Sequence, residues 1–495
     1  MAKSSARRFR RSAAQLHALA SVERTISTSD SVSRCRYLKD YARAFQTYRS
    51  VLTPEELNCD LRQADMVLIG DYHALAAAQA YAAALVELLA EGARPVLLCL
   101  EAVLARDQRI LDEWYRGEID CEELRERIRF DSDWGYDWHP YRDLLETARK
   151  VTAGVYGIDC PPRSDMRTIA RRDRHAASQL LELRRRHPQA VIVVLFGESH
   201  LAPNHLPSLL HDQEQKTRTV TVLQNVDALY WQAAGEPGGV GAVRVDADVV
   251  CAFTSTPLEK YENYRLYLDQ WRRERPSTPD LAPSFCNLIH TLRRFLSLDR
   301  RGIAFRPDNY PEVSCTKGSQ SIRRRLKRAA LTEGEIIETM AAIRLRGSCY
   351  VPAAHTIFAN RFLMPEAAEE AARFVHHACH PEEIASAIKP SKEDEFYKHV
   401  VEQAAAYLGS KILCPTRVVT CVADASVRLG QTLASHVYEA YVAGKVNKRF
   451  LRALFCAPIL EPGAAREIYL STMAKLKSGC VPPQPHFGQI SPMVS

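Results

Sequence analysis

The sequence predicts an α/β fold, a mostly parallel sheet flanked by helices, followed by a mainly α-helical C-terminal region. Short apolar runs alternate with segments of helical periodicity between about residues 66 and 223. Such alternation is typical of a parallel sheet with helices on both faces. After Thr254 the strand-like runs give way to helical periodicity. The 495 residues, 46% of them hydrophobic, are enough for more than one globular core.

The expected elements of the N-terminal half follow from the spacing of apolar residues. A helix at Tyr37–Tyr48 comes first, and Thr53 with Glu56 gives a helix-start signal. The elements then predicted are strand Met66–Gly70, helix Ala74–Leu89, strand Pro95–Leu100, helix Leu104–Trp114, strand Val155–Ile158, helix Arg167–Arg186, strand Ala190–Phe196 and strand Val220–Leu223.

The C-terminal half is predicted to be helical around one interval rich in proline and basic residues. That interval, Arg306–Lys327, is expected to be a linker or basic loop. The predicted helices are Tyr261–Trp271, Phe285–Leu296, Glu333–Leu345, Pro365–His380, Glu393–Leu408 and Ser426–Ala443. We therefore expect a basic N-terminal arm and helix (1–50), an α/β domain (51–255), a helical and basic connecting region (256–330), a helical region (331–480) and a proline-rich tail (481–495).

The charge and the cysteine content bear on the binding partner and on the cellular location of the protein. The 66 Lys+Arg and 59 Asp+Glu give a net charge of +7 that is spread over local clusters, so a nucleic-acid partner is not indicated. No apolar run approaches the roughly 18 residues of a membrane helix. The 14 cysteines include no CxxC pair. Together with the lack of an apolar leader or lipobox-type cysteine near the start, this predicts a reducing, cytoplasmic location.

Two predicted strands end in the same pattern, Gly-acid-x-His. The strand at Met66 runs into Gly70-Asp71-Tyr72-His73, and the strand at Ala190 runs into Gly197-Glu198-Ser199-His200. Ligands of open parallel sheets bind at the carboxyl ends of the strands. Both histidines are therefore expected to face one cleft.

Two further strands end in an acid, Glu101 after Leu100 and Asp159 after Ile158. Any one such acid could simply cap the following helix. The four coincidences together predict a functional cleft instead. Its expected central residues are His73, Glu101 and His200, with Asp71, Glu198 and Asp159 in support.

Two chemistries suit imidazoles beside carboxylates. His73, His200 and Glu101 could be the ligands of a divalent metal ion, or they could perform metal-free acid/base catalysis. The residues alone leave both open. An acyl nucleophile at Ser199 is not favoured, because Leu201 replaces the second glycine of the GxSxG pattern.

These strand ends resemble those of a known family. The paired GxxH motifs, Glu101, the stretch Gln108…Leu111-Asp112…Trp114…Gly117 and the region Trp134…Trp138…Tyr141 resemble the ChaN-like haem-binding uptake domain of the Tiki superfamily. That superfamily also includes TraB-like proteins, Tiki-type metalloproteases and erythromycin-esterase-like proteins. The resemblance covers about Ala64 to Leu223. It implies an α/β fold with His73, Glu101 and His200 at the centre of its cleft.

The resemblance implies a protein that binds haem, iron or a metal complex, so the expected cofactor is haem or a divalent metal ion. The alternative is a metal-dependent or His/Glu-dependent hydrolase of the peptidase or esterase type, acting in the same cleft. Residues expected to contact the cofactor are Tyr72, Asp71, Glu198, Asp159, Trp138 and Tyr141. Their aromatic members, with Trp134 and Tyr136, would suit a flat apolar ligand, although each could equally be a core residue, and a tyrosine can be an axial haem ligand. The partner is then a small molecule or a hydrolysable substrate, and the oligomeric state is open.

Two other clusters have a structural interpretation that we prefer. His376 and His380, with Cys379 beside them, have the spacing of metal ligands, but they end a helix, where cationic groups are expected near the dipole. The basic run Arg171–His175 could reach an anionic group of a ligand. A solvated helix face is the preferred interpretation of that run.

Overall fold

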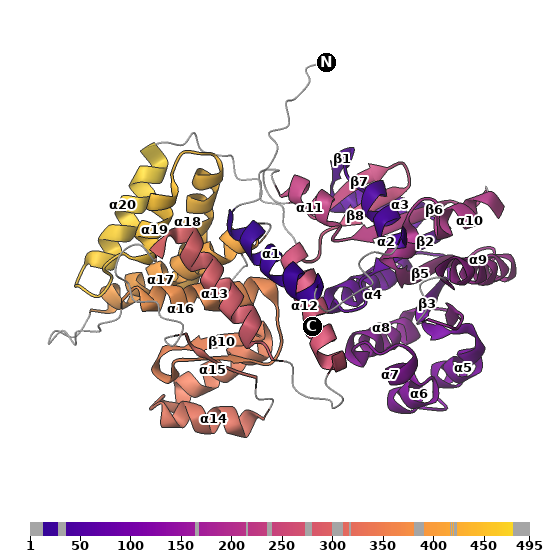
Figure 1. Ribbon diagram of the computed structural model, residues 1–495, viewed down its shortest axis with the longest axis horizontal. Helices are drawn as coiled ribbons and strands as arrows, with labels where there is room; N and C mark the ends of the chain where they lie inside the picture. The colour runs from indigo at the N-terminus through magenta and orange to yellow at the C-terminus, as the bar shows by residue number, and fades with distance from the viewer. Residues whose placement is uncertain are drawn as a thin grey trace, which may run out of the picture. The chain divides into compact units, whose positions relative to one another are not determined.

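The computed structural model describes residues 13–27, 36–163, 168–213, 216–234, 240–272, 280–298, 310–315, 318–380, 391–415, 417, 419 and 423–478. The chain folds into two compact units; the first extends to Pro279, and the second comprises the chain from Asp280 together with Ala13–Gln15. The first contains an eight-stranded, mostly parallel sheet flanked by helices, and the second is mainly helical (Figure 1). The predicted fold class is confirmed.

The sheet of the first unit has the strand order β1-β7-β8-β6-β2-β5-β3-β4. The six strands from β8 to β4 are parallel, and β7 and β1 add an antiparallel edge. The strands are β1 (Ser50–Leu52), β2 (Met66–Asp71), β3 (Val96–Leu104), β4 (Gly154–Asp159), β5 (Val191–Gly197), β6 (Thr219–Gln224), β7 (Ala242–Asp246) and β8 (Val249–Ala252).

The helices of this part of the chain include those predicted around residues 37–48, 74–89, 104–114, 167–186 and 261–271, together with others that were not predicted. They are α1 (Ala13–Ser27), α2 (Arg36–Ala44), α3 (Pro54–Gln63), α4 (Ala76–Ala90), α5 (Gln108–Arg116), α6 (Cys121–Arg127), α7 (Phe130–Asp133), α8 (Trp138–Val151), α9 (Ile169–Arg186), α10 (Leu206–Gln213), α11 (Asp227–Ala233) and α12 (Pro257–Arg272). Thr53 and Glu56 form a capping box at the start of α3, as the helix-start signal indicates.

The two faces of the sheet bury separate apolar cores, because successive side chains of a strand point to opposite faces. Val67 and Ile69 of β2 pack with Trp114 and Leu144 in one core. Met66 and Leu68 pack with residues of α9 and α10 in the other. Since both faces are covered, the strands read as continuous apolar runs.

Three features of the first unit differ from the prediction. β3 continues to Leu104, so Glu101 lies inside a strand, at a register shift between Leu100 and Leu104. The antiparallel edge of β1 and β7 was not predicted; these strands are short and partly exposed, so their apolar signal is weak. The basic N-terminal arm is wrong for residues 13–27, which form α1; residues 1–12 lie outside the described part.

Gln108, one of the residues that carry the family resemblance, has a structural role. Its side-chain amide donates to Val155 O (2.9 Å) and its carbonyl oxygen accepts from Gly157 N (2.9 Å). These bonds continue the ladder along β4, the outermost parallel strand. The Gln108 side chain therefore satisfies backbone groups at the free edge of the sheet.

The described part of the second unit contains five of the predicted helices, three helices that were not predicted and a small sheet that was not predicted. Its elements are α13 (Ala282–Leu296), β9 (Glu312–Ser314), α14 (Ser319–Arg328), α15 (Glu333–Arg346), β10 (Ser348–Val351), β11 (Thr356–Ala359), α16 (Met364–Ala378), α17 (Lys392–Leu413), α18 (Ala425–Val442), α19 (Lys448–Phe455) and α20 (Ala464–Ser478). The predicted helices are α13 and α15 to α18, those not predicted are α14, α19 and α20, and the helix predicted at Tyr261–Trp271 is α12 of the first unit. The three strands pair in the order β10-β11-β9. A linker over Arg306–Lys327 is wrong where β9 and α14 lie, because Ile322 and Leu326 bury an apolar stripe of α14. The predicted proline-rich tail lies outside the described residues.

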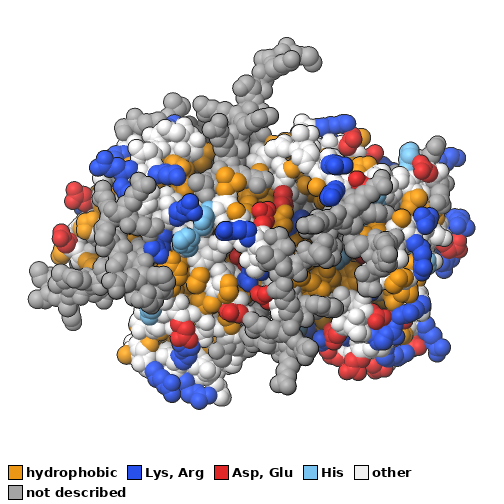
Figure 2. Space-filling view, viewed as in Figure 1, with side chains coloured by type: hydrophobic (Ala, Val, Ile, Leu, Met, Phe, Trp, Pro, Cys, Tyr) orange, Lys and Arg blue, Asp and Glu red, His pale blue; other side chains and the backbone are white. Residues whose placement is uncertain are grey.

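Charges are mixed over the described part of the face shown in Figure 2, where basic, acidic and apolar side chains alternate. Within the described residues, no helix combines the length and the apolar character that crossing a membrane requires.

Candidate functional site

The sheet topology brings the two GxxH motifs, Glu101 and Asp159 to one edge, although β3 continues past Glu101 to Leu104. β2 and β5 are neighbours, and their register places Asp71 opposite Gly197. The two GxxH motifs therefore leave the sheet side by side. β3 lies on the other side of β5 and β4 lies beyond it, so Glu101 and Asp159 follow along the same edge.

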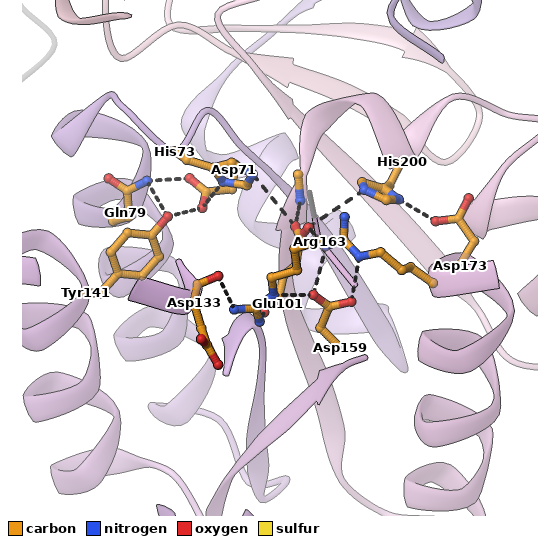
Figure 3. A network of polar contacts seen from close by, with 12 residues as sticks. Asp71, His73, Gln79, Glu101, Asp133, Tyr141, Asp159, Arg163, Asp173 and His200 are labelled. Atoms are coloured by element: carbon orange, nitrogen blue, oxygen red, sulfur yellow. Dashed lines mark hydrogen bonds and ion pairs between the residues drawn. The ribbon is translucent and has the colours of Figure 1, made fainter. Parts of the chain in front are cut away.

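Glu101 lies between the two histidines (Figure 3). Its Oε2 is 4.0 Å from His73 Nε2, and its Oε1 is 3.7 Å from His200 Nε2. Gly197 N donates a hydrogen bond to Oε2. The convergence predicted from the strand ends is therefore present in the structure.

Each histidine is oriented by an aspartate on its other ring nitrogen. His73 Nδ1 donates to Asp71 Oδ2 (2.9 Å), and His200 Nδ1 donates to Asp173 Oδ1. A carboxylate only accepts, so both rings carry the proton on Nδ1 and direct Nε2 toward Glu101. Asp71 also accepts from Tyr141 Oη (2.7 Å), which fixes its own orientation.

Arg172 ties Glu101 to Asp159. Its guanidinium donates to Glu101 Oε1 and to both oxygens of Asp159, at 2.9 and 2.8 Å. Arg163 donates to Asp159 Oδ2 (2.7 Å) and to the backbone oxygen of Glu101. The preferred interpretation of the Arg171–His175 run is thus wrong at Arg172 and Asp173, which are buried and belong to the network.

These contacts decide the protonation of Glu101. Burial alone would raise its pKa, but the Arg172 guanidinium, followed by His200 and His73, lowers the pKa of Glu101 from 4.5 to about 2. For His73, burial lowers the pKa, and the charge and hydrogen bond of Asp71 outweigh it and raise the pKa above 6.5. Glu101 is therefore a carboxylate at neutral pH and a weak base, whereas the raised pKa of His73 makes its imidazole the stronger base.

The lowered pKa of Glu101 predicts acid-sensitive stability. A depressed pKa contributes stability above pH 4.5, and that contribution is lost as pH falls from 4.5 to about 2. The shift corresponds to roughly 3 kcal/mol in the free energy of unfolding. Urea unfolding at pH 6, 4 and 3, followed by tryptophan fluorescence, should show this loss in the wild type and a smaller one in Glu101→Gln. The exposed Glu91→Gln should keep the wild-type pH dependence, and an equal dependence in all three proteins would contradict the assignment.

His73 is the member of the central trio that reaches the surface. Its side chain is 21% exposed, against 4% for Glu101 and for His200. Trp134 and Tyr136 flank its ring, with centroids 4.5 and 5.0 Å away. An incoming ligand can therefore reach His73 far more readily than the other two.

α12 adds residues that the sequence analysis missed. Lys260 Nζ donates to both oxygens of Glu198, each at 3.0 Å, and lies 4.6 Å from the centroid of the Tyr72 ring. Tyr264 packs on Tyr72, and Tyr267 stacks on Tyr136 at 4.3 Å. A continuous, partly exposed aromatic wall is thus formed by Tyr72, Tyr264, Tyr267 and Tyr136, and its member Tyr136 packs against His73.

The residues predicted to contact a cofactor fall into separate places. Asp71 and Tyr141 join His73, and Asp159 joins Glu101 through Arg172. Glu198 and Tyr72 lie with Lys260 instead. Trp138 is 2% exposed and packs against Phe130 in the apolar core, so the structure does not bring it to the site.

The donor set does not fit a divalent metal ion. Both oxygens of Glu101 already accept hydrogen bonds, from Arg172 and from Gly197 N, and the guanidinium would repel a second cation. Over the described ranges no group of three or more His, Cys, Asp and Glu side chains is arranged to hold a metal ion.

At the C-terminal end of α16, His376 and His380 form hydrogen bonds with backbone carbonyl oxygens. His376 Nδ1 contacts Phe455 O (3.0 Å), and His380 contacts His376 O (2.9 Å) and Ala457 O (2.6 Å). Their ring nitrogens bridge backbone carbonyl oxygens, which agrees with a structural interpretation.

Comparisons with known proteins point to the first unit. Residues 57–192 match the family described as haem-binding uptake, Tiki superfamily, ChaN. A search of curated proteins gave no match. One similar structure, titled as cofacial haem binding to ChaN of Campylobacter jejuni, is 17% identical and has a TM-score of 0.30; the alignment covers 35% of this chain and 86% of that one.

Two other structures are similar at the same level. The type III effector HopBA1 is 15% identical with a TM-score of 0.32, over 42% of this chain and 96% of that one. The C-terminal region of Pasteurella multocida toxin, described with a thiol-protease-like catalytic triad, is 12% identical with a TM-score of 0.29. That alignment covers 73% of this chain and 45% of that one.

Proposed function

We propose, from the premise that residues 57–192 form a ChaN-like domain of the Tiki superfamily, that this chain binds haem with His73 as the iron ligand. The observation that carries the proposal is the Asp71–His73 pair at the surface of the sheet edge. Asp71 holds the proton on Nδ1 and so leaves Nε2 as the metal-binding nitrogen. Haem supplies an iron atom that such an imidazole can ligate.

The surroundings of His73 fit a flat apolar ligand. Trp134 and Tyr136 pack against the imidazole, and Tyr136 belongs to the aromatic wall of Tyr72, Tyr136, Tyr264 and Tyr267. Aromatic side chains offer large apolar contact area to a planar ring. Glu101 Oε2 lies 4.0 Å from His73 Nε2, so iron would bind Nε2 beside this carboxylate. His200, Arg172 and Asp173 are buried around Glu101.

A haem titration tests the proposal. We expect the wild type to develop a Soret band with a saturable, stoichiometric endpoint, and His73→Ala to lose at least about 100-fold in affinity, since loss of an iron bond removes several kcal/mol. The measurement is made at pH 8, because the raised pKa of His73 means that acid would protonate the ligand nitrogen.

A matched control is present in the same domain. His139 also has a hydrogen bond to the aspartate two residues before it, from Nδ1 to Asp137 Oδ1 at 2.9 Å, but its side chain is 68% exposed and apart from the site. His139→Ala should bind haem like the wild type. An equal loss of haem affinity in both variants, or no loss of haem affinity in His73→Ala, would contradict the proposal.

A hydrolase remains the second candidate, on one observation. An aspartate on Nδ1 and a raised pKa are the properties of a general base, so His73 Nε2 could take the proton of an attacking water. Glu101 is a poor candidate for that role because of its low pKa. Ester and peptide hydrolysis that disappears in His73→Ala, without haem affinity in the wild type, would favour this alternative.

A further inference from the structure

The second unit contains a cavity of about 680 Å³ with an unusual lining. It lies among the ends of α13 and α16 and the faces of α19 and α20. Three basic side chains, Arg449, Arg452 and Lys475, line it, and none of the described lining residues is acidic. Within the described part of the chain, Arg449 and Arg452 form no ion pair or side-chain hydrogen bond. A cavity of this size and charge suits an anionic small molecule.

Two thiols lie side by side in the same lining. The sulfur atoms of Cys379 and Cys456 are 3.8 Å apart, and both residues are partly exposed. Each is the C-cap residue of its helix, α16 and α19, where small shifts of the chain are easiest. A disulfide needs the sulfurs at about 2.05 Å, so a modest approach of the two ends would join them.

We propose that this cavity is a dithiol site that exchanges with an anionic low-molecular-weight disulfide. The basic side chains attract the anion, Phe450 and Leu454 contact its apolar parts, and the paired thiols react with its sulfur–sulfur bond. The inference is independent of haem binding, since it rests on residues of the second unit alone.

The exchange balances in two steps. The Cys456 thiolate attacks one ligand sulfur, forms a mixed disulfide and releases one ligand thiol. Cys379 then attacks Cys456 Sγ, forms the protein disulfide and releases the second ligand thiol. Overall two cysteine thiols are oxidised, one ligand disulfide is reduced to two thiols, and the two cysteine protons go to the departing thiols.

The order of attack follows from the environment of Cys379. The hydrogen bond with Cys456, then burial, then the charge of Cys456 raise the pKa of Cys379. A raised pKa makes Cys379 the poorer attacking thiol, so Cys456 attacks first in this scheme and Cys379 resolves the mixed disulfide.

The test compares disulfides of different charge on the reduced full-length chain. Glutathione disulfide is anionic, 2-hydroxyethyl disulfide is neutral and cystamine is cationic. Alkylation and peptide mass spectrometry follow the rate at which the Cys379–Cys456 disulfide forms. We expect the ratio of the glutathione disulfide rate to the cystamine rate to fall about tenfold in Arg449→Gln/Arg452→Gln, because electrostatic steering changes rates by that order.

Two controls make the outcome decisive. Cys59 is exposed on α3 beside Asp60, so its rates should be unchanged in the double variant. Cys379→Ser should stop at a mixed disulfide on Cys456. Failure of the Cys379–Cys456 disulfide to form would overturn the proposal, and so would a charge ratio that is the same in the wild type and the double variant.

Discussion

Replacing Arg172 by alanine is expected to lower the free energy of unfolding of the first unit by about 3–5 kcal/mol. Its guanidinium is 8% exposed and pairs with Glu101 and Asp159, whose carboxylates are at most 4% exposed. Removing one partner of a buried pair leaves the other charge uncompensated in a medium that solvates it poorly, which gives the size of the effect. The same change should raise the pKa of Glu101, because Arg172 is the largest influence that lowers it.

The chain allows this measurement to be confined to the first unit. All five tryptophans precede residue 280, so tryptophan fluorescence during urea unfolding reports on that unit alone. Arg174, exposed on the same helix, gives the control, and Arg174→Ala should leave the urea midpoint nearly unchanged. Similar midpoints for both variants would show that the Arg172 pairs do not hold the sheet edge together.

Gly197→Ala is expected to weaken haem binding about tenfold while the fold is retained. A methyl group at Gly197 would lie 3.0 Å from Glu101 Oε2 and 3.2 Å from His73 Nε2. The backbone of Gly197 has a φ of −51°, which alanine adopts readily. The expected effect is therefore a displacement of the Glu101 and His73 side chains and not a strained backbone. Crowding of this kind costs about 1–3 kcal/mol, and 1.4 kcal/mol corresponds to tenfold in affinity.

The other GxxH glycine provides the matched comparison. A methyl group at Gly70 would meet Leu201 Cδ1 at 3.4 Å and Glu198 Cβ at 3.5 Å, which are ordinary contacts. Gly70→Ala should therefore bind haem within about twofold of the wild type. Equal losses at both glycines would mean that the contact between Gly197, Glu101 and His73 has no part in binding.

The sequence was sufficient to place the carboxyl ends of β2, β4 and β5 and their titratable residues, whereas β3 continues past Glu101 to Leu104. Apolar runs buried on both faces give a strong signal, and the carboxyl ends of parallel strands share one edge. This is why His73, Glu101 and His200 could be predicted to converge before the strand order was known. The strand order β2-β5-β3-β4, which the sequence did not give, determines which of these side chains are neighbours.

The remaining site residues gave no such signal. Arg172 and Asp173 lie on α9, in a basic run that is indistinguishable from a solvated helix face until the helix is docked on the sheet. Lys260 and Tyr267 lie on α12, more than 50 residues beyond the second GxxH motif. Their partners are set by packing, which local periodicity does not encode. The small sheet of the second unit was missed for a related reason, because its strands are only three or four residues long.

Chemical rescue of a histidine-deleted variant tests most directly whether His73 is the ligand of haem iron. His73→Gly removes the imidazole and leaves space beside Trp134 and Tyr136. The account predicts that its haem spectrum differs from that of the wild type and that added imidazole restores the wild-type Soret band, whereas His139→Gly needs no rescue. A His73→Gly spectrum identical to that of the wild type before imidazole is added would contradict the account.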